Sequence, residues 1–408
     1  MVDNNKKTLL STVYNTYGTM IYYFMQWVTT VLVVRILGYD ENGVFSLCIS
    51  FTNVFGFISR FGERSVQLTD VDDEFSEKQY FGVRILATAF SVVCMLVALL
   101  FVSFDKHTLI CCIAYGIFKV FESFTDYFFT IMQKKERYSA IAVSYTLKSF
   151  FPLAGFVFGI WLSGLMMGIV FMSVVYFAVF VYDYYVIYRQ NRPSISFNNI
   201  TPIIKKCIPI MLYSLILPYM TFINRYFVKL VYDEEQLGYY STISIVLVIM
   251  STIAGSIWVV LLPRLTKMYN DKENKKIAKF LFVISGSVII VSGIAVLLGE
   301  LLGPWAFSLI FGEEIRSYMY LLSSTLIASA CLVFSSLFST VLMFMKKRIK
   351  MLIYNAVGAV ALTIIIKPFV ERFGLLGSNY ALIISFALQT VLLITSSVVG
   401  LIKNRKAK

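Results

Sequence analysis

Runs of about 20 apolar residues recur along this chain, and they constrain its fold more than any other feature. A helix of ~20 apolar residues matches the ~30 Å hydrocarbon core of a bilayer. Only 14% of the residues are charged, against ~25% in soluble domains, and no large soluble domain fits between the runs. We expect an all-α polytopic membrane protein with twelve spans, at roughly 9–34, 43–62, 85–104, 108–131, 139–162, 165–188, 207–229, 236–262, 280–300, 317–344, 350–370 and 376–402.

The distribution of basic residues supports this count. Cytoplasmic segments close to spans are enriched in Lys and Arg. With twelve spans, 26 of the 36 basic residues, Arg64 and Arg84 among them, fall in inner segments, 6 fall in outer segments and 4 lie in spans or at a span's edge. We therefore expect both termini in the cytoplasm. Membrane topology also accounts for the net charge of +13 without a nucleic-acid partner.

The chain divides into two related halves. Residues 191–206 are rich in Pro, Ser and Asn and predict a cytoplasmic linker between lobes at 1–190 and 207–408. Motifs recur in both halves: Gly43-Val-Phe-Ser46 and Gly238-Tyr-Tyr-Ser241, Gln67-Leu-Thr69 and Arg264-Leu-Thr266, and Met132-Gln-Lys-Lys135 and Met345-Lys-Lys-Arg348. Two six-helix lobes related by a pseudo-two-fold axis normal to the membrane would place a substrate path in a central cavity between them.

Four cations lie inside or at the edge of the apolar runs. They are Lys119, Lys148, Arg225 and Arg60, in our order of preference as lumen residues that contact an anionic cargo. A cation at mid-bilayer costs ~2.5–3.5 kcal/mol on insertion scales, so it is kept where it faces a protein interior or a wet cavity. Alternatively, the two arginines snorkel to an interface, and Lys119 only neutralises Glu122, three residues away.

The fourth span also carries two acids. Lys119, Glu122 and Asp126 follow i, i+3, i+7 spacing and so share one helix face. We expect Glu122 or Asp126 to bind and release H⁺ or Na⁺ during transport. A static charge network is the alternative. Asp183, near the inner end of the sixth span, is expected to be an interfacial residue.

Polar and aromatic residues of the first span are candidates for sugar contacts, namely Tyr14, Asn15, Tyr22 and Gln26. An interfacial aromatic belt would collect the same tyrosines. In the seventh span, Pro209 and Pro218 lack a backbone donor and favour a bend that could serve gating, although such kinks also occur without that role.

No catalytic or metal motif accompanies these features. The six cysteines fall in apolar spans without ligand-like spacing to the single histidine, so they are expected to be small buried hydrophobes. We expect no metal site, no bound cofactor beyond a coupling H⁺ or Na⁺, and no enzymatic activity.

The motifs resemble those of the Wzx-type polysaccharide and O-antigen flippases over nearly the entire chain. The resemblance rests on Arg35-Ile-Leu-Gly38, Asn224-Arg-Tyr-Phe-Val228, Leu237-Gly-Tyr-Tyr-Ser241, Leu262-Pro-Arg264 and Phe311-Gly-Glu-Glu314. It implies the polysaccharide transporter branch of the multidrug/oligosaccharidyl-lipid/polysaccharide exporter superfamily. It further implies twelve helices in two lobes and export of undecaprenyl-diphosphate-linked oligosaccharides to the outer leaflet of the cytoplasmic membrane.

Two alternatives stay open. A cation-coupled multidrug exporter would share the fold but would favour acidic cavities, whereas embedded bases outnumber embedded acids here. A membrane-embedded polysaccharide-assembly enzyme would carry a larger outer loop. As partners we expect the lipid-linked oligosaccharide, membrane lipids and polysaccharide polymerase machinery, and we expect a monomer because each chain already holds both halves.

Overall fold

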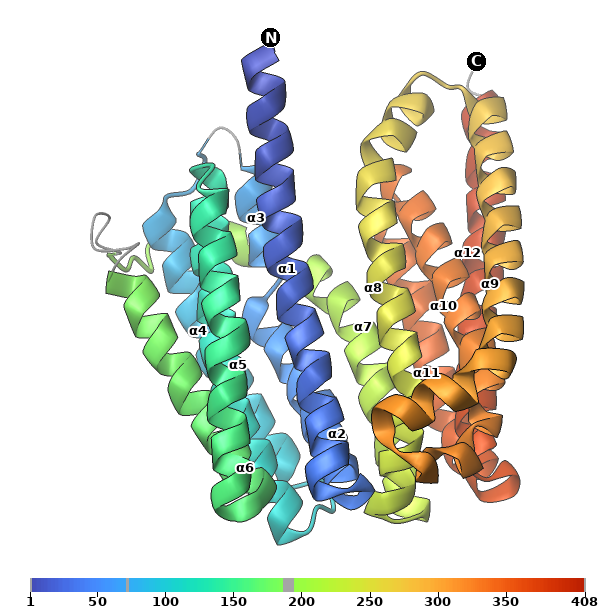
Figure 1. Ribbon diagram of the computed structural model, residues 1–408. Coiled ribbons are helices and arrows are strands. Elements are labelled where there is room, and N and C mark those ends of the chain that lie inside the picture. The colour runs from blue at the N-terminus through green and yellow to red at the C-terminus, as the bar shows by residue number, and fades with distance from the viewer. Residues whose placement is uncertain (1, 71–72, 186–193, 407–408) are drawn as a thin grey trace. The chain divides into compact units, whose positions relative to one another are not determined.

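The computed structural model describes residues 2–70, 73–185 and 194–406, without the side chains of 2–13, 15, 259–260 and 403–406. Within these ranges the regular elements are all helices (Figure 1). They are α1 (Val2–Leu37), α2 (Tyr39–Arg60), α3 (Glu63–Thr69), α4 (Glu77–Leu99), α5 (Lys106–Lys134), α6 (Tyr138–Asp183), α7 (Thr201–Val231), α8 (Glu234–Asn270), α9 (Asn274–Phe311), the 3₁₀ helix η2 (Glu313–Tyr318), α10 (Tyr320–Phe344), α11 (Arg348–Phe373) and α12 (Leu375–Lys406).

Eleven helices of the described chain are long and apolar enough to cross a membrane. One of them, α6, has 46 residues, which at 1.5 Å per residue is about twice the length that a bilayer requires. Its helical geometry is interrupted at Ser163 and Gly164, and Figure 1 shows two antiparallel arms joined at one end. The chain thus makes twelve passes, and the predicted all-α polytopic fold is confirmed.

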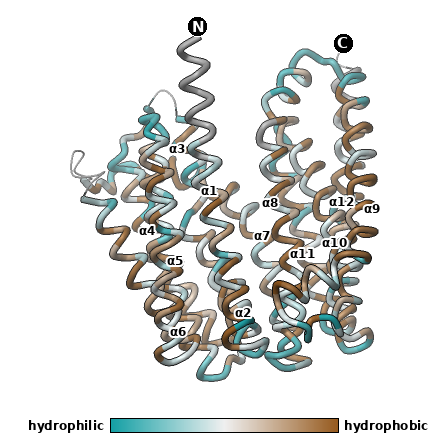
Figure 2. The backbone as a smooth tube through the Cα atoms, in the orientation of Figure 1, coloured by the Kyte–Doolittle hydropathy of each residue, from teal (hydrophilic) through white to brown (hydrophobic). Residues whose placement is uncertain are grey.

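Hydrophobic residues dominate the middle of the helices, and hydrophilic residues gather at helix ends and in connections (Figure 2). Helices suit the hydrocarbon core of a bilayer because each helix satisfies its own backbone hydrogen bonds where no water is present. The free cysteines are buried or half-buried, as predicted.

The chain forms two compact units, Met1–Pro218 and Tyr219–Lys408. In the first unit α1 packs along α6, and α5 packs against α2 and α6. In the second unit α10 packs against α8 and α12, and α12 also packs against α11.

The division between the units falls inside α7, at Pro218. The first half of α7 contributes the fully buried Ile203 and Cys207 to a hydrophobic cluster of the first unit. In the second half, Asn224 exchanges hydrogen bonds with Ser378 of α12, at 2.9 and 3.2 Å. Residues 201–206, part of the predicted linker, are already helical in α7. Residues 186–193 lie outside the described residues.

Matching turns reveal the internal repeat. Glu136 (φ 55°), between α5 and α6, and Lys346 (φ 59°), between α10 and α11, are left-handed and lie 210 residues apart. Gly164 and Gly374, in the turns between the last two passes of each half, are also left-handed and again 210 residues apart. The sequence alignment of Met132 with Met345 is therefore three residues out of structural register.

Candidate functional site

Charged residues of four helices in the first unit meet against one face of α5. The helix α2 ends at Arg60, and a left-handed turn at Phe61 and Gly62 is followed directly by α3 at Glu63. This tight turn keeps Arg60, Glu63 and Arg64 close to one another. They lie beside Lys119, Glu122 and Asp126 of α5 and Arg84 of α4, and we call these seven residues the α5 charge network.

Glu122 accepts hydrogen bonds or ion pairs from three donors. Its carboxylate oxygens lie 2.7 Å from Lys119 Nζ, 3.0 Å from an Arg60 guanidinium nitrogen and 2.9 Å from the Tyr22 hydroxyl. The i, i+3 spacing of Lys119 and Glu122 makes their pairing possible on one helix face. Two cations therefore share a single carboxylate.

Asp126, one helical turn further on, lies in a balanced group. Arg64 donates to Asp126 at 2.8 Å and to Gln133 at 2.9 Å. Arg84 Nε donates to Glu63 at 2.9 Å, and its Nη2 lies 3.6 Å from Asp126. Both Arg84 and Glu63 have fully buried side chains, so this pair is an internal structural feature.

The network as a whole carries one uncompensated positive charge, since four cations face three carboxylates. The surplus belongs to the group in which Arg60 and Lys119 share Glu122. The side chains of Arg60 and Arg64 are 30% and 31% exposed, while Lys119 is only 9% exposed. The two guanidinium groups are thus the part of the network that an anion reaches first.

Lys148, a predicted lumen residue, lies in a separate buried pair. Its Nζ is 2.5 Å from Asp183 and 3.2 Å from Ser144, and Ser144 also donates to Asp183. The rings of Phe129 and Tyr176 flank the ammonium group at 5.2 and 5.5 Å. Asp183 is the last residue of α6 and is buried, because the two arms of α6 bring it into contact with Lys148.

The remaining predicted lumen residue, Arg225, is buried in the second unit near Tyr240. Pro209 and Pro218 both lie within the continuous helix α7, with Pro218 at the boundary between the units.

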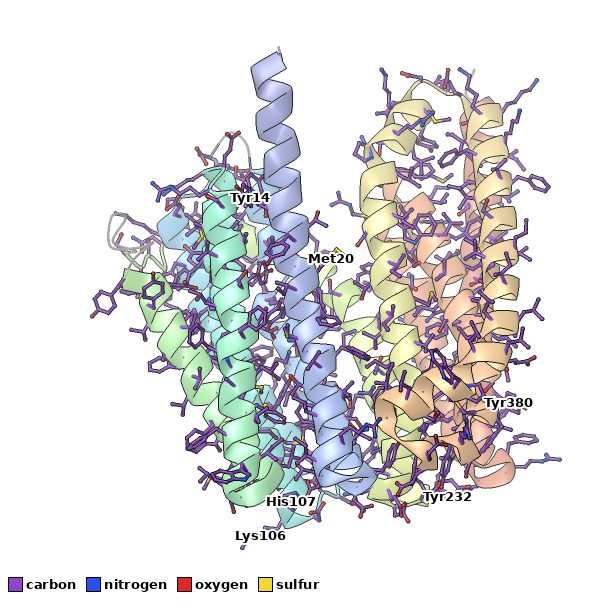
Figure 3. All side chains as sticks on the ribbon, in the orientation of Figure 1. Tyr14, Met20, Lys106, His107, Tyr232 and Tyr380 are labelled. Carbon is purple, nitrogen blue, oxygen red and sulfur yellow. The ribbon has the colours of Figure 1, made fainter. Side chains whose placement is uncertain are left out.

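The sugar candidates of α1 occupy different environments. Tyr22 is buried and its hydroxyl is bonded to Glu122, whereas Gln26 is half-buried. Tyr14 is 41% exposed and is labelled with Met20 on α1 in Figure 3. The side chain of Asn15 lies outside the described residues.

Sequence reasoning missed Glu63, Arg64 and Arg84 as members of the network. Arg64 and Arg84 were counted as inner-loop cations, but both contact the network, and Arg84 is completely buried. Their signal was the position of one glutamate and two arginines directly beside the ends of the second and third predicted spans.

One acidic side chain outside the spans orders the connection between α3 and α4. Burial raises the pKa of Asp70, but this effect is outweighed by hydrogen bonds from the Glu74 amide, the Tyr80 hydroxyl and the Phe75 amide. The pKa of Asp70 therefore lies below its usual value. In the described residues no cluster of His, Cys, Asp and Glu could hold a metal ion.

Two helical units with an internal repeat, twelve passes and a largely buried charge network define a polytopic membrane protein. The fold is similar to an inward-facing multidrug resistance MATE family transporter of the MOP superfamily, with TM-score 0.74, 12% identity, and coverage of 97% of this chain and 99% of that one. An outward-facing transporter of that family gives TM-score 0.64, 13% identity and coverage of 98% and 96%. The transporter VcmN of Vibrio cholerae in its bent form gives TM-score 0.61, 12% identity and coverage of 98% and 97%.

Sequence comparison places the chain within one branch of this superfamily. The family model described as "Polysaccharide biosynthesis protein" matches residues 9–269. The capsular polysaccharide biosynthesis protein CapF of Staphylococcus aureus is 25% identical over 290 residues, which are 69% of this chain and 72% of CapF. The chain belongs to the polysaccharide biosynthesis protein family, the Wzx-type flippases of the MOP superfamily, and the resemblance predicted from the motifs is confirmed.

Proposed function

We propose that this protein is a flippase for undecaprenyl-diphosphate-linked oligosaccharide repeat units. It would carry them from the inner to the outer leaflet of the cytoplasmic membrane, by alternating access of its two lobes, for cell-surface polysaccharide assembly. The observation that carries the proposal is the surplus positive charge of the α5 charge network, presented by the partly exposed side chains of Arg60 and Arg64. Membership of the polysaccharide biosynthesis protein family supports a glycan-linked cargo.

The chemistry of these two residues suits a diphosphate. A guanidinium group donates two parallel hydrogen bonds to phosphate oxygens, and such charge-assisted bonds are about twice as strong as neutral ones. Arg60 shares Glu122 with Lys119, so it can turn toward a phosphate while the carboxylate stays paired. We therefore favour Arg60 and Arg64 as the phosphate-contacting pair, with Lys119 as the internal counterion.

Ion coupling remains part of the proposal. An incoming H⁺ or Na⁺ would compete with Lys119 and Arg60 for Glu122, and with Arg64 for Asp126. Binding of an anionic cargo by the arginines would leave Glu122 paired with Lys119 and Asp126 with Arg84, so each carboxylate would have one cation fewer to compete with the ion. Export of an anion from a negative interior is also favoured by ~2.3 kcal/mol per charge per 100 mV, so the membrane potential alone could drive it.

The proposal is tested by deleting the gene and measuring lipid-linked oligosaccharides on the inner leaflet. Arg60→Gln and Arg64→Gln are compared with wild type at equal protein level, and Lys78→Gln, an exposed cation outside the network, is the matched control. Loss of one charge-assisted hydrogen bond, ~1.5–3 kcal/mol, predicts roughly a ten- to hundred-fold slower transport. Arg60→Lys keeps the positive charge but cannot donate two parallel hydrogen bonds. Its transport rate should lie between those of wild type and Arg60→Gln.

Each outcome has a consequence. Accumulation of the lipid-linked units without the protein, relieved by wild type and Lys78→Gln but poorly by the arginine variants, supports the proposal. Normal lipid-linked pools together with a changed drug sensitivity would instead assign the chain to the multidrug branch. We also propose that the protein acts as a monomer beside the polymerase machinery, with both termini in the cytoplasm.

A further inference from the structure

One flank of α1 is polar and aromatic along four helical turns. At 100° per residue, six side chains fall within an arc of about 100°. We call them the α1 stripe, and they are Thr16, Thr19, Tyr23, Gln26, Trp27 and Thr30. Tyr23 is 52% exposed, Thr16 is exposed, and the other four are half-buried. The stripe is therefore accessible on the surface of the first unit.

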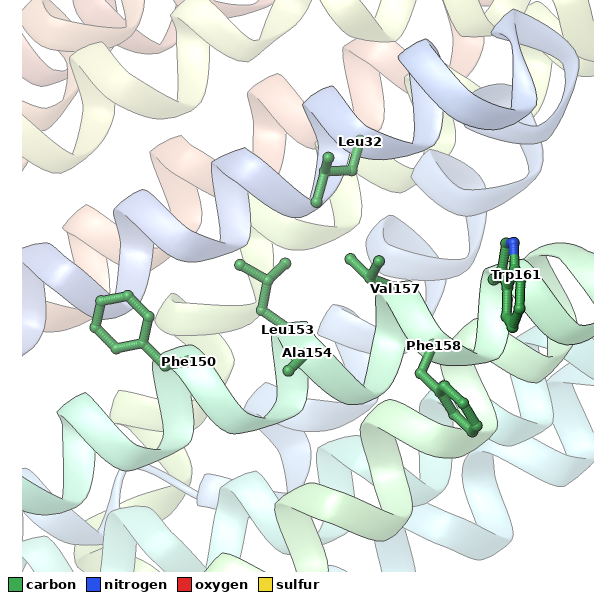
Figure 4. A pocket seen from close by; sticks show the side chains of 7 residues that line it. All are labelled: Leu32, Phe150, Leu153, Ala154, Val157, Phe158 and Trp161. Atoms are coloured by element: carbon green, nitrogen blue, oxygen red, sulfur yellow. The ribbon is translucent and has the colours of Figure 1, made fainter.

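The opposite flank of α1 has another character. Leu32 lies nine residues from Tyr23 and so points in the opposite direction on the helix. It lines an apolar groove of about 580 Å³ between α1 and the first arm of α6, together with Phe150, Leu153, Ala154, Val157, Phe158 and Trp161 (Figure 4). That flank suits hydrocarbon. The polar Tyr, Gln and Thr side chains of the stripe suit a polar medium, so the two flanks of α1 fit different surroundings.

The α1 stripe lies beside the α5 charge network. Tyr22, the neighbour of Tyr23, donates its hydroxyl hydrogen bond to Glu122 at 2.9 Å. Tyr23 itself lies within electrostatic range of the partly exposed Arg60 and Arg64, and of their carboxylate partners Glu122 and Asp126. A ligand held by these guanidinium groups would thus have the stripe within reach.

We propose that the α1 stripe binds the glycan of the lipid-linked cargo while Arg60 and Arg64 hold its diphosphate. This inference rests on the proposed function. Tyr and Trp provide rigid amphipathic surfaces that pack against the apolar faces of sugar rings, and the amide of Gln26 and the threonine hydroxyls supply donors and acceptors. The stripe spans 14 residue steps, about 21 Å, which suits an oligosaccharide better than a single sugar.

The inference also revises the sugar contacts expected from sequence. Gln26 belongs to the stripe, but Tyr22 faces inward and is engaged by Glu122. Tyr23 and Trp27 take its place because they lie on the accessible flank.

Two cargoes separate the glycan from the diphosphate. Purified protein in proteoliposomes is given undecaprenyl diphosphate bearing a complete repeat unit or bearing only its first sugar. Tyr23→Ala, Trp27→Ala and Gln26→Leu are tested beside the milder Tyr23→Phe and Trp27→Phe. Phe24→Ala, an exposed residue outside the stripe, is the matched control.

Each stripe variant should slow transport of the complete repeat unit by about two- to ten-fold. Transport of the single-sugar cargo should be slowed much less. Arg60→Gln should slow both cargoes. Equal slowing of both cargoes by the stripe variants, or no slowing by any folded stripe variant, would overturn the inference. If wild type moves neither cargo, the proposed function itself fails, and this result is distinct from the others.

Discussion

The buried pair of Lys148 and Asp183 allows a decisive distinction between a structural cation and a cargo-binding one. The side chains are 1% and 3% exposed, and the pair joins the two arms of α6. The substitution Lys148→Met keeps an unbranched side chain but removes the charge. It leaves Asp183 in the interior, where the Ser144 hydroxyl still donates a hydrogen bond to its carboxylate.

The loss of folding free energy expected for each single variant follows from the burial of both Lys148 and Asp183. Removing one member of a buried ion pair costs ~3–5 kcal/mol, because the other charge stays uncompensated in a medium of low dielectric constant. Replacing both members with apolar groups of similar volume is often neutral or stabilising by ~1–4 kcal/mol. The double variant Lys148→Met/Asp183→Leu should therefore recover at least ~3 kcal/mol relative to either single variant, about a hundred-fold in the folding equilibrium.

The assay is unfolding of the purified protein in detergent, for wild type, both single variants and the double variant, alongside transport in proteoliposomes. The double-mutant cycle isolates the coupling between the two residues. We expect the single variants to unfold more readily and the double variant to regain stability and most of its transport. A Lys148→Met protein as stable as wild type but inactive would refute the reasoning. A stable but inactive double variant would likewise return Lys148 to the cargo-binding residues.

Three further predictions test other parts of the structure. Glu63→Gln should destabilise the protein by about 3–5 kcal/mol in detergent unfolding, because Arg84 is fully buried beside it; an unchanged unfolding midpoint would contradict their pairing. Gly164→Ala should cost ~1–3 kcal/mol in the same measurement, since φ 77° and ψ −162° are reserved for glycine, whereas Gly255→Ala, with open space and no unusual φ, should not. The stabilising contribution of Asp70 should be present above its unfolded pKa of ~3.9 and disappear as the pH falls through its lowered folded pKa. The stability difference between wild type and Asp70→Asn should therefore shrink in acid, and a difference that persists there would exclude this carboxylate as its cause.

The charge network shows where sequence reasoning succeeded and where it stopped. The i, i+3, i+7 spacing correctly placed Lys119, Glu122 and Asp126 on one face of α5, because helix geometry alone sets that relation. It did not reveal that Arg84 and Glu63 complete the network, since they come from α4 and α3 and meet only when those helices pack. Their position near span ends was equally compatible with solvated loops.

Sequence by itself determined that this protein lies in a membrane, how many times it crosses the membrane and that its two halves are related. Apolar run length is matched to bilayer thickness, and recurring motifs such as Gly43-Val-Phe-Ser46 and Gly238-Tyr-Tyr-Ser241 indicate the two halves. Only tertiary structure decided which embedded charges neutralise each other. Lys148 and Asp183 are 35 residues apart and meet because α6 folds back on itself, whereas Arg60 keeps a partly exposed guanidinium. The energy of a charge in a membrane depends on its nearest partners in space, and side-chain type and span position do not specify those partners.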